Sequence, residues 1–209
     1  MEKNYIEIMS GKKEILIIAN GESILKNDYG DFIDKHPLVA RINNYQTKGF
    51  EKQIGRKTDI WFNGANSKLK LQTAKYSNII VLMPSQIILK KQSDLNGHVS
   101  KRLKLDKEHY TTVSLSDIQY FENQVGYNRL TTGLYSILWA VKNYNKVIIH
   151  GFDFFQDSKA HYYDNSFSKL LIKNNIIKKG QKHNNILEKE FVNGLIGENK
   201  IKTLKNIHG

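Results

Sequence analysis

The segment Thr131-Thr132-Gly133 carries the clearest chemical signal in the sequence. It precedes a stretch from Leu134 to Lys142 with helical apolar spacing, and so predicts the start of a helix. The first N–H groups of a helix lack intrahelical partners and the helix dipole adds partial positive charge, so this turn can hold an anion. The threonine hydroxyls add donors, and Gly133 lets a ligand approach the backbone. An ordinary threonine-capped helix packed on a sheet is the alternative.

Polar side chains also follow two apolar runs nearer the N-terminus. Glu14 to Ala19 leads into Asn20, and Leu38 to Ile42 leads into Asn43. Short apolar runs of this kind are typical of buried parallel strands. Open α/β sheets bind ligands beyond the carboxyl ends of their strands, so both asparagines are candidates for a binding site.

The alternation of apolar runs with helical stretches predicts an α/β fold. We expect one Rossmann-like domain over residues 1–209, with a mostly parallel sheet and helices on both faces. Residues 85–128 are irregular and rich in lysine and aromatic residues, and predict a small lid or acceptor-side insertion with short helices around Leu103 to His109 and Ser116 to Glu122. Further strands are expected at Asp59 to Gly64, Ile79 to Met83 and Lys146 to Gly151, and further elements at Phe167 to Ile177, Asn184 to Leu195 and Ile201 to Leu204.

Composition narrows the class of protein. The 209 residues include no cysteine, which excludes disulfides, thiolate catalysis and cysteine-based zinc sites. No apolar run approaches the roughly 20 residues of a membrane span, and no signal peptide is evident, so we expect a cytoplasmic protein. The net charge of +12 favours an anionic partner such as a phosphorylated substrate, an acidic membrane or nucleic acid. No dinucleotide-binding or P-loop glycine pattern is present.

An ordered set of short motifs resembles the sialylmotifs of the sialyltransferases. The order is specific because the pieces spread from residue 15 to residue 188. The chain also resembles the small bacterial lipooligosaccharide sialyltransferases, above all from Arg129 to Gln156. The matching pieces are Ile17 to Ser23, Arg41 to Asn43, Gly49 to Glu51, Gly55 to Thr58, Thr131 to Gly133, Gly151 to Asp153, His161 to Asp164 and His183 to Glu188.

The resemblance implies a variant GT-A fold, a CMP-sugar donor and a set of site residues. His161 and Tyr162 would lie near the departing phosphate, and His183 would act as the base. The implied donor-binding residues are Asn20, Gly21, Ser23, Asn43, Asn63, Thr131, Thr132, Gly133 and Phe152.

The resemblance implies an inverting, metal-independent glycosyltransferase that moves sialic acid from CMP-sialic acid to a hydroxyl of an acceptor glycan. A bacterial surface lipopolysaccharide or capsule is the expected acceptor, and the enzyme would need no cofactor beyond its CMP-sugar substrate. Asp153 and Asp157 do not form a cluster with coordination geometry, so Asp153 is expected to be structural and no metal is predicted. Asp164 and Glu188 are expected to orient neighbouring polar groups.

Other functions stay open. A CMP-Kdo or other CMP-ulosonic acid transferase would use the same donor site. A nucleotide-binding module would keep Asn20 and Thr131 but need no base. The lysine-rich segments Lys68 to Lys75 and Lys90 to Lys104 would suit a nucleic-acid binder, although solvated faces or peripheral contact with an acidic inner membrane surface explain them more simply. We therefore expect no nucleic-acid partner.

Overall fold

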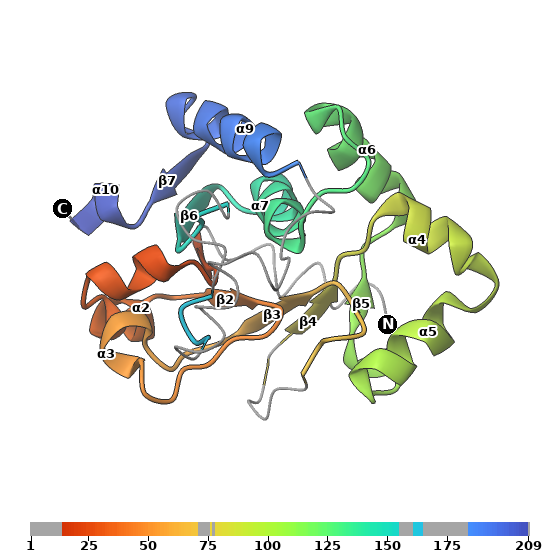
Figure 1. Cartoon of the computed structure of the whole chain (residues 1–209), viewed down its shortest axis with the longest axis horizontal. Coiled ribbons are helices and arrows are strands. Elements are labelled where there is room, and N and C mark those ends of the chain that lie inside the picture. Colours follow the sequence, from red (N-terminus) through yellow and green to blue (C-terminus); the bar gives the residue numbers. More distant parts are fainter. Residues whose placement is uncertain (1–13, 71–75, 77, 155–160, 165–183, 209) are drawn as a thin grey trace.

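Seven parallel strands form one sheet in the part of the chain that the structure describes (Figure 1). The structure is a computed structural model and describes residues 14–70, 76, 78–154, 161–164 and 184–208. The strand order is β5-β4-β3-β2-β1-β6-β7. The strands are β1 (Glu14–Ile18), β2 (Val39–Ile42), β3 (Ile60–Asn63), β4 (Asn78–Val81), β5 (Thr111–Thr112), β6 (Lys146–His150) and β7 (Ile201–Thr203).

Helices connect the strands and cover both faces of the sheet (Figure 1). The α-helices are α2 (Gly30–Lys35), α3 (Glu51–Ile54), α4 (Ser85–Lys90), α5 (Leu95–Leu103), α6 (Leu115–Val125), α7 (Thr132–Asn143), α9 (Asn185–Gly197) and α10 (Lys205–His208). Three 3-10 turns accompany them: η1 (Glu22–Lys26), η2 (Gln92–Asp94) and η3 (Lys107–His109).

The apolar strands are buried on both sides because each face packs on its own helix layer. In β1, Ile15 and Ile17 belong to the core that includes Leu134 of α7. Leu16 and Ile18 face the second core, which contains residues of α2 and α3. Alternate side chains of a strand point to opposite faces, so a strand buried on both faces has the continuous apolar run seen in the sequence.

All strands of the sheet are parallel, so the loops that follow them lie at one edge, the carboxyl edge. Strands β2 to β5 extend the sheet on one side of β1, whereas β6 and β7 lie on its other side. The order of the chain therefore reverses between β1 and β6, and such a switch point is where open α/β sheets bind ligands. Helix α7 ends shortly before β6 begins, so its N-terminus, at Thr132, lies toward the carboxyl edge of the sheet.

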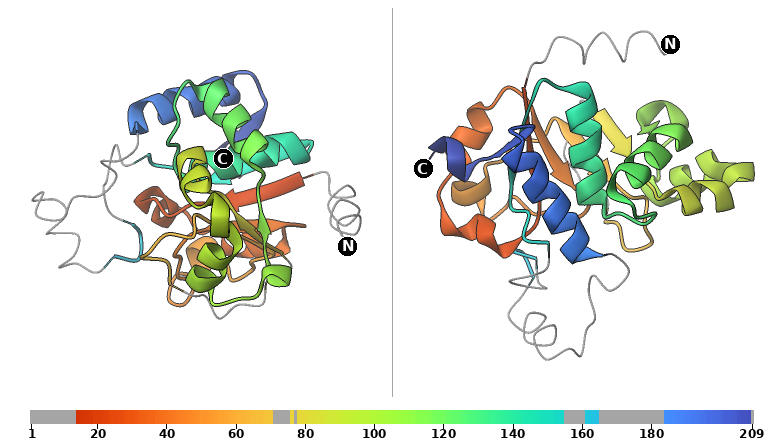
Figure 2. Two further views of the ribbon diagram at one scale, coloured as in Figure 1. Left: turned by 90° about the vertical axis from the view of Figure 1, so that its right-hand side faces the viewer. Right: turned by 90° about the horizontal axis from the view of Figure 1, so that it is seen from above.

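The predicted α/β class, the mostly parallel sheet and the helices on both faces are confirmed. Residues 85–128 are more regular than expected, and the helix predicted around Ser116 to Glu122 is α6, whereas a lid or insertion role for this segment stays a prediction. A helix was predicted around Leu103 to His109, but α5 ends at Leu103 and only η3 follows. Helices α4 and α5 lie at the opposite end of the molecule from α2 and α10 (Figures 1 and 2). The expected element from Phe167 to Ile177 lies outside the described residues.

Candidate active site

The loops that follow β1 and β6 contact each other directly at the switch point. The Gly21 amide donates to the Gly151 carbonyl at 2.8 Å. The carboxylate of Asp153 accepts hydrogen bonds from the Ser23 amide, at 2.9 Å, and from the Ser23 hydroxyl. A Cβ atom at Gly21 would lie 2.3 Å from Cγ of Asp153, so only glycine fits beside this carboxylate. Asp153 therefore holds the first loop in place, as the sequence analysis expects.

Asn20 joins the end of β1 to the end of β2. Its Nδ2 atom donates to the carbonyls of Ile42, at 2.9 Å, and Asn44, at 3.0 Å. Its buried Oδ1 atom has no hydrogen-bond partner among the described residues. A buried polar atom without a partner is uncommon in folded proteins and is often satisfied by a ligand or water. The side chain predicted to contact the donor thus has one acceptor left at the carboxyl edge.

Asn43, Gly64 and Thr132 bring the ends of β2, β3 and the start of α7 together. Asn43 has a left-handed backbone with φ of 49°, a conformation that asparagine adopts more readily than most residues. Its Oδ1 atom accepts from the Gly64 amide at 3.1 Å. A Cβ atom at Gly64 would lie 2.9 Å from the Thr132 hydroxyl oxygen. Asn43 and Thr132, two predicted donor-binding residues that lie 89 positions apart in the sequence, therefore both lie next to Gly64.

The two threonines before Gly133 have different surroundings. The Thr131 amide and hydroxyl donate to the two carboxylate oxygens of Glu188 at 2.7 and 2.5 Å. The same hydroxyl caps α7 by accepting from the Leu134 amide at 3.1 Å. The amide and hydroxyl of Thr131, which were predicted to face the donor, are therefore bonded to Glu188 and to α7 itself. Thr132 is the threonine that lies beside Asn43 and Gly64.

Phe152 lies against the start of α7. A Cβ atom at Gly133 would come 3.3 Å from its Cε1 atom, so the glycine allows the ring to approach the helix closely. Phe154 follows with φ of 49°, an unusual conformation for a bulky residue, and its ring centroid lies 6.1 Å from that of Phe152. These rings place an apolar surface next to the polar groups of the helix terminus.

The segment from His161 to Asp164 packs on the loop after β1. His161 pairs with Gly21 in an isolated antiparallel bridge, and the Tyr162 amide donates to the Asn20 carbonyl at 3.1 Å. The His161 ring stacks on Tyr163 with centroids 5.3 Å apart. The structure therefore places His161 beside two residues of the predicted donor site, although it lies about 140 residues from them in the sequence.

Tyr162 and Tyr163 fasten this segment to the loop after β2. The buried Tyr162 hydroxyl donates to the Gln46 carbonyl at 2.6 Å and accepts from the Gln46 amide at 3.0 Å. The Tyr163 hydroxyl donates to the Asn44 carbonyl at 2.9 Å. Burial raises the pKa of Tyr162 to about 12, so its hydroxyl stays protonated at neutral pH. Asn44, Gln46 and Tyr163 were not predicted as site residues, although Asn44 and Gln46 follow β2 in a polar stretch and Tyr163 belongs to the motif from His161 to Asp164.

Two predicted site residues remain, Asn63 and His183. Asn63, at the end of β3, is 0% exposed, and its Oδ1 atom accepts from the Ala65 amide at 3.1 Å in a local turn. Its Nδ2 atom is buried without a hydrogen-bond partner among the described residues. His183, the predicted base, lies outside the described residues, and its role stays a prediction.

Burial shifts the protonation of two further groups around this edge. Glu188 is 0% exposed, and burial raises its pKa to about 7 although its hydrogen bonds with Thr131 act in the opposite direction. Burial lowers the pKa of His150, at the end of β6, to about 4. His150 is therefore neutral at physiological pH, whereas Glu188 is close to its titration midpoint.

One group of possible metal ligands occurs in the described part of the chain. Asp106, Glu108 and His109 bring ligand atoms within 4.8 Å of one another, and all three residues are exposed. They precede β5, so they lie toward the amino edge of the parallel sheet rather than at the edge that holds Asn20 and Thr132. In the described residues, no helix has the length and apolar character that a membrane span requires.

A mostly parallel sheet with helices on both faces and a reversal of the strand order between β1 and β6 defines an α/β protein of the Rossmann-like class. Residues 10–200 match the model of glycosyltransferase family 29 (sialyltransferase). The chain belongs to this family, and the resemblance seen in the sequence is confirmed.

Individual relatives agree with the family model. A Gallus gallus protein named CMP-N-acetylneuraminate-beta-galactosamide-alpha-2,3-sialyltransferase 1 is 29% identical over 167 residues, which cover 73% of this chain and 48% of the relative. An Arabidopsis thaliana beta-1,6-galactosyltransferase is 39% identical over 72 residues, which cover 31% of this chain and 18% of the relative. The chain thus spans about half or less of the length of these relatives.

The fold also matches solved structures. A mammalian sialyltransferase in complex with Gal-beta-1-3GalNAc-ortho-nitrophenol superimposes with a TM-score of 0.66 at 21% identity. The match covers 93% of this chain and 70% of that structure. This likeness supports the predicted Rossmann-like, GT-A type fold.

Proposed function

We propose that this protein is an inverting glycosyltransferase that moves sialic acid from CMP-sialic acid to a hydroxyl of an acceptor glycan. The observation that carries the proposal is the convergence of the ends of β1 and β2 with the start of α7 in a chain of this family. Asn20, Gly21 and Asn43 would bind the CMP part of the donor. Thr132 and Gly133 would face the carboxylate and the ribose, because a helix N-terminus favours a negative charge.

The chemistry needs little more than orientation and one proton transfer. CMP is already a good leaving group, so the enzyme must align the acceptor hydroxyl with the anomeric carbon and remove its proton. His183 is proposed as the base, since imidazole titrates near neutral pH. His161, beside Gly21, would donate to the phosphate as the bond to the sugar breaks, and a single displacement would invert the configuration.

Tyr162 contributes to this proposal by holding His161 in place. Its hydroxyl is buried and bonded to Gln46, so a direct contact with the phosphate would require both hydrogen bonds to break. The proposed reaction uses no metal ion and no cofactor. Metal independence is supported by the contacts of Asp153. Its carboxylate, which lies against Gly21, already accepts hydrogen bonds from the Ser23 amide and hydroxyl.

The proposed acceptor is an oligosaccharide or glycolipid of a bacterial surface, such as lipopolysaccharide or capsule. The net charge of +12 supports a cytoplasmic enzyme that meets its acceptor at the acidic inner face of a membrane. CMP-Kdo is the alternative donor, because the CMP contacts would be the same. The Arabidopsis thaliana relative makes transfer of galactose a further candidate.

Release of the nucleotide during turnover tests the proposal. The protein would be incubated with CMP-sialic acid, CMP-Kdo or UDP-galactose, each with a panel of acceptor sugars, in the presence and absence of EDTA. Acceptor-dependent CMP release from CMP-sialic acid that persists in EDTA is the expected result. Turnover only with CMP-Kdo or UDP-galactose would reassign the donor, and turnover that EDTA abolishes and magnesium restores would overturn metal independence. Binding of CMP without any turnover would favour a nucleotide-binding module. Salt-sensitive binding of random oligonucleotides would favour a nucleic-acid-binding protein.

A further inference from the structure

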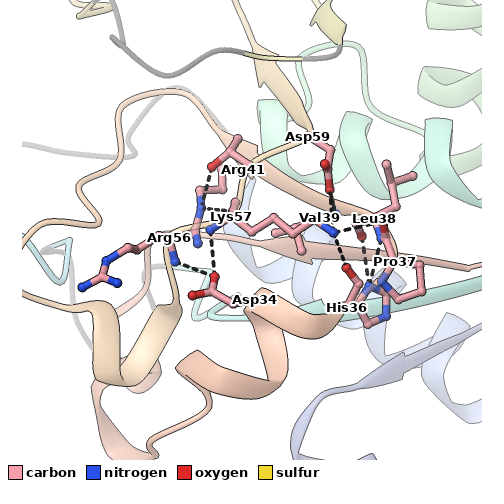
Figure 3. Close-up of polar contacts among 10 residues, drawn as sticks. Asp34, His36, Pro37, Leu38, Val39, Arg41, Arg56, Lys57 and Asp59 are labelled. Carbon is pink, nitrogen blue, oxygen red and sulfur yellow. Dashed lines mark hydrogen bonds and ion pairs between the residues drawn. The ribbon is translucent and has the colours of Figure 1, made fainter.

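Arg41 of β2 is a buried arginine whose hydrogen bonds go to the loop between β2 and β3. The residue is 1% exposed, and its hydrogen bonds with the described residues all go to neutral oxygen atoms, two of which belong to residues drawn in Figure 3. The acceptors are the carbonyls of Ile54 at 2.6 Å, Gly55 at 3.3 Å and Lys57 at 3.1 Å, and the Thr58 hydroxyl at 3.0 Å.

The positive charge of Arg41 has no carboxylate partner among the described residues. Its Nη1 atom is buried and makes no hydrogen bond there. Asp34 is the carboxylate that interacts with it through space, but the Asp34 Oδ1 atom accepts from the amides of Arg56 and Lys57 instead (Figure 3). Burial lowers the pKa of Arg41, yet an arginine side chain stays charged in proteins. A buried, uncompensated charge is costly, so its presence calls for an explanation.

The guanidinium of Arg41 lies close to groups that border the candidate site. Arg41 is two residues before Asn43, and its guanidinium carbon lies 5.5 Å from the ring centroid of Tyr45. Burial raises the pKa of Tyr162 to about 12, and the positive charge of Arg41 works against this rise. The same charge helps to lower the pKa of His150 at the end of β6. The electrostatic field of Arg41 therefore acts on Tyr162, next to the loops after β1 and β2, and on His150, at the end of β6.

We propose that Arg41 is a positioning residue for the nucleotide phosphate, which it attracts with a charge that has no carboxylate in hydrogen-bond contact among the described residues, while its fork of donors holds the segment from Ile54 to Thr58 that leads into β3. The inference rests on the proposed function, because it takes the ligand to be a nucleoside monophosphate unit. Charges in a protein interior interact over longer distances than charges in water, so a group close to the site can contribute to binding of an anion. A purely structural arginine would hold the loop equally well for a charged and an uncharged ligand.

Comparison of CMP with cytidine separates these roles, since the two ligands differ by the phosphate. Affinities would be measured by calorimetric titration of CMP and by displacement of CMP with cytidine, at one low salt concentration. The variants are Arg41→Gln, which removes the charge and keeps donors, and Arg41→Lys, which keeps the charge and loses the fork. Arg56→Gln is the matched control, because Arg56 lies in the same loop with a side chain that is 75% exposed.

The expected result is that Arg41→Gln lowers CMP affinity on the order of tenfold while cytidine affinity changes by less than about twofold. Arg41→Lys should keep the wild-type ratio of the two affinities even if it unfolds at a lower temperature, and Arg56→Gln should change neither ligand. Equal losses for CMP and cytidine, or no loss for either, would overturn the inference. If Arg41→Gln does not fold, Arg41→Met, which is also uncharged, takes its place in the same comparison: a tenfold loss for CMP alone would support the inference, and equal losses for the two ligands would overturn it. A wild-type protein that binds neither ligand would instead contradict the proposed function.

Discussion

The carboxylate of Glu188, in α9, accepts hydrogen bonds from both the amide and the hydroxyl of Thr131, the residue that caps α7. This pair joins the last long helix to the helix terminus of the candidate site. Because the carboxylate is fully buried, its protonation is linked to folding, and the pair gives a prediction about stability and pH.

Glu188→Gln should reduce the free energy of unfolding most at acidic pH. The pKa of Glu188 in the folded protein is about 7, above the ordinary value of 4.5, so the folded state binds the proton more tightly. The stabilisation that the protonated Glu188 side chain provides is fully present below the ordinary pKa of 4.5. It is lost as the pH rises through the pKa of about 7 in the folded protein. Glutamine does not titrate. The stability advantage of the wild type should therefore shrink from about pH 5 to about pH 8, by up to roughly 1.4 kcal/mol per pH unit.

Urea unfolding across this pH range would measure the difference, with Glu190→Gln on the exposed side of α9 as the control. An advantage of the wild type that grows with pH would show that the ionised carboxylate is the stabilising form.

Gly21→Ala should destabilise the protein by about 1–3 kcal/mol, because the new methyl group would overlap the Asp153 carboxylate. Movement of Asp153 would also release the hydrogen bonds of Ser23 and weaken CMP binding. Gly194→Ala in α9 is the control, since a Cβ atom there meets nothing within 4 Å. That change should raise stability by about 0.5–1 kcal/mol, as alanine usually does within a helix. Thermal unfolding of both variants would measure the contrast, and equal behaviour would contradict the packing described at Gly21.

Thr132→Val should weaken CMP binding by about 1–3 kcal/mol with little effect on stability, because its hydroxyl lies beside Asn43 and Gly64 rather than in the helix cap. Thr131→Val should behave in the opposite way and lower stability, since it removes the cap and the hydroxyl contact with Glu188. Calorimetric titration and thermal melts of both variants, with Thr111→Val on β5 as a control, would separate them. A CMP affinity unchanged in Thr132→Val would remove this residue from the donor site.

Tyr162→Phe should lower stability by about 1–2 kcal/mol, because both main-chain groups of Gln46 lose a partner. The rate at saturating donor should stay within about threefold of wild type, since the hydroxyl is occupied by Gln46 and does not act on the phosphate. The two measurements are a melting curve and a turnover rate. A large loss of rate without a loss of stability would assign the hydroxyl to the reaction itself.

The prediction for His183 concerns the proton-transfer step. His183→Ala should reduce transfer by about 10²–10⁴-fold with CMP binding unchanged, the range expected for a general base. The wild-type rate should rise with pH as the imidazole loses its proton, and the variant should lack this dependence. His109→Ala, an exposed histidine before β5, is the control. A folded His183→Ala variant with the wild-type rate and pH profile would leave the reaction without an identified base.

Local sequence signals located most of the sheet and part of the site. The continuous apolar runs of β1 and β6 can only be satisfied by burial on both faces, which is why they predicted parallel strands. The two threonines at the start of α7 likewise have a local signature. By contrast, the short strand β5 has two residues and no periodic pattern. The separate partners of Thr131 and Thr132 depend on contacts with distant residues, Glu188 and Gly64, which no local pattern contains.

The central place of β1 has a consequence for how the chain reaches its native state. One side of β1 pairs with β2, which follows closely in the sequence, but the other side pairs with β6, residue for residue from Glu14 with Lys146 to Ile18 with His150. During synthesis the second side of this apolar strand therefore stays unpaired until the chain has been made as far as Lys146 to His150. Pairing over such a separation is slow, and the waiting strand edge is prone to aggregate. Fragments that end before β6 should consequently be insoluble, whereas the full chain can close its own sheet.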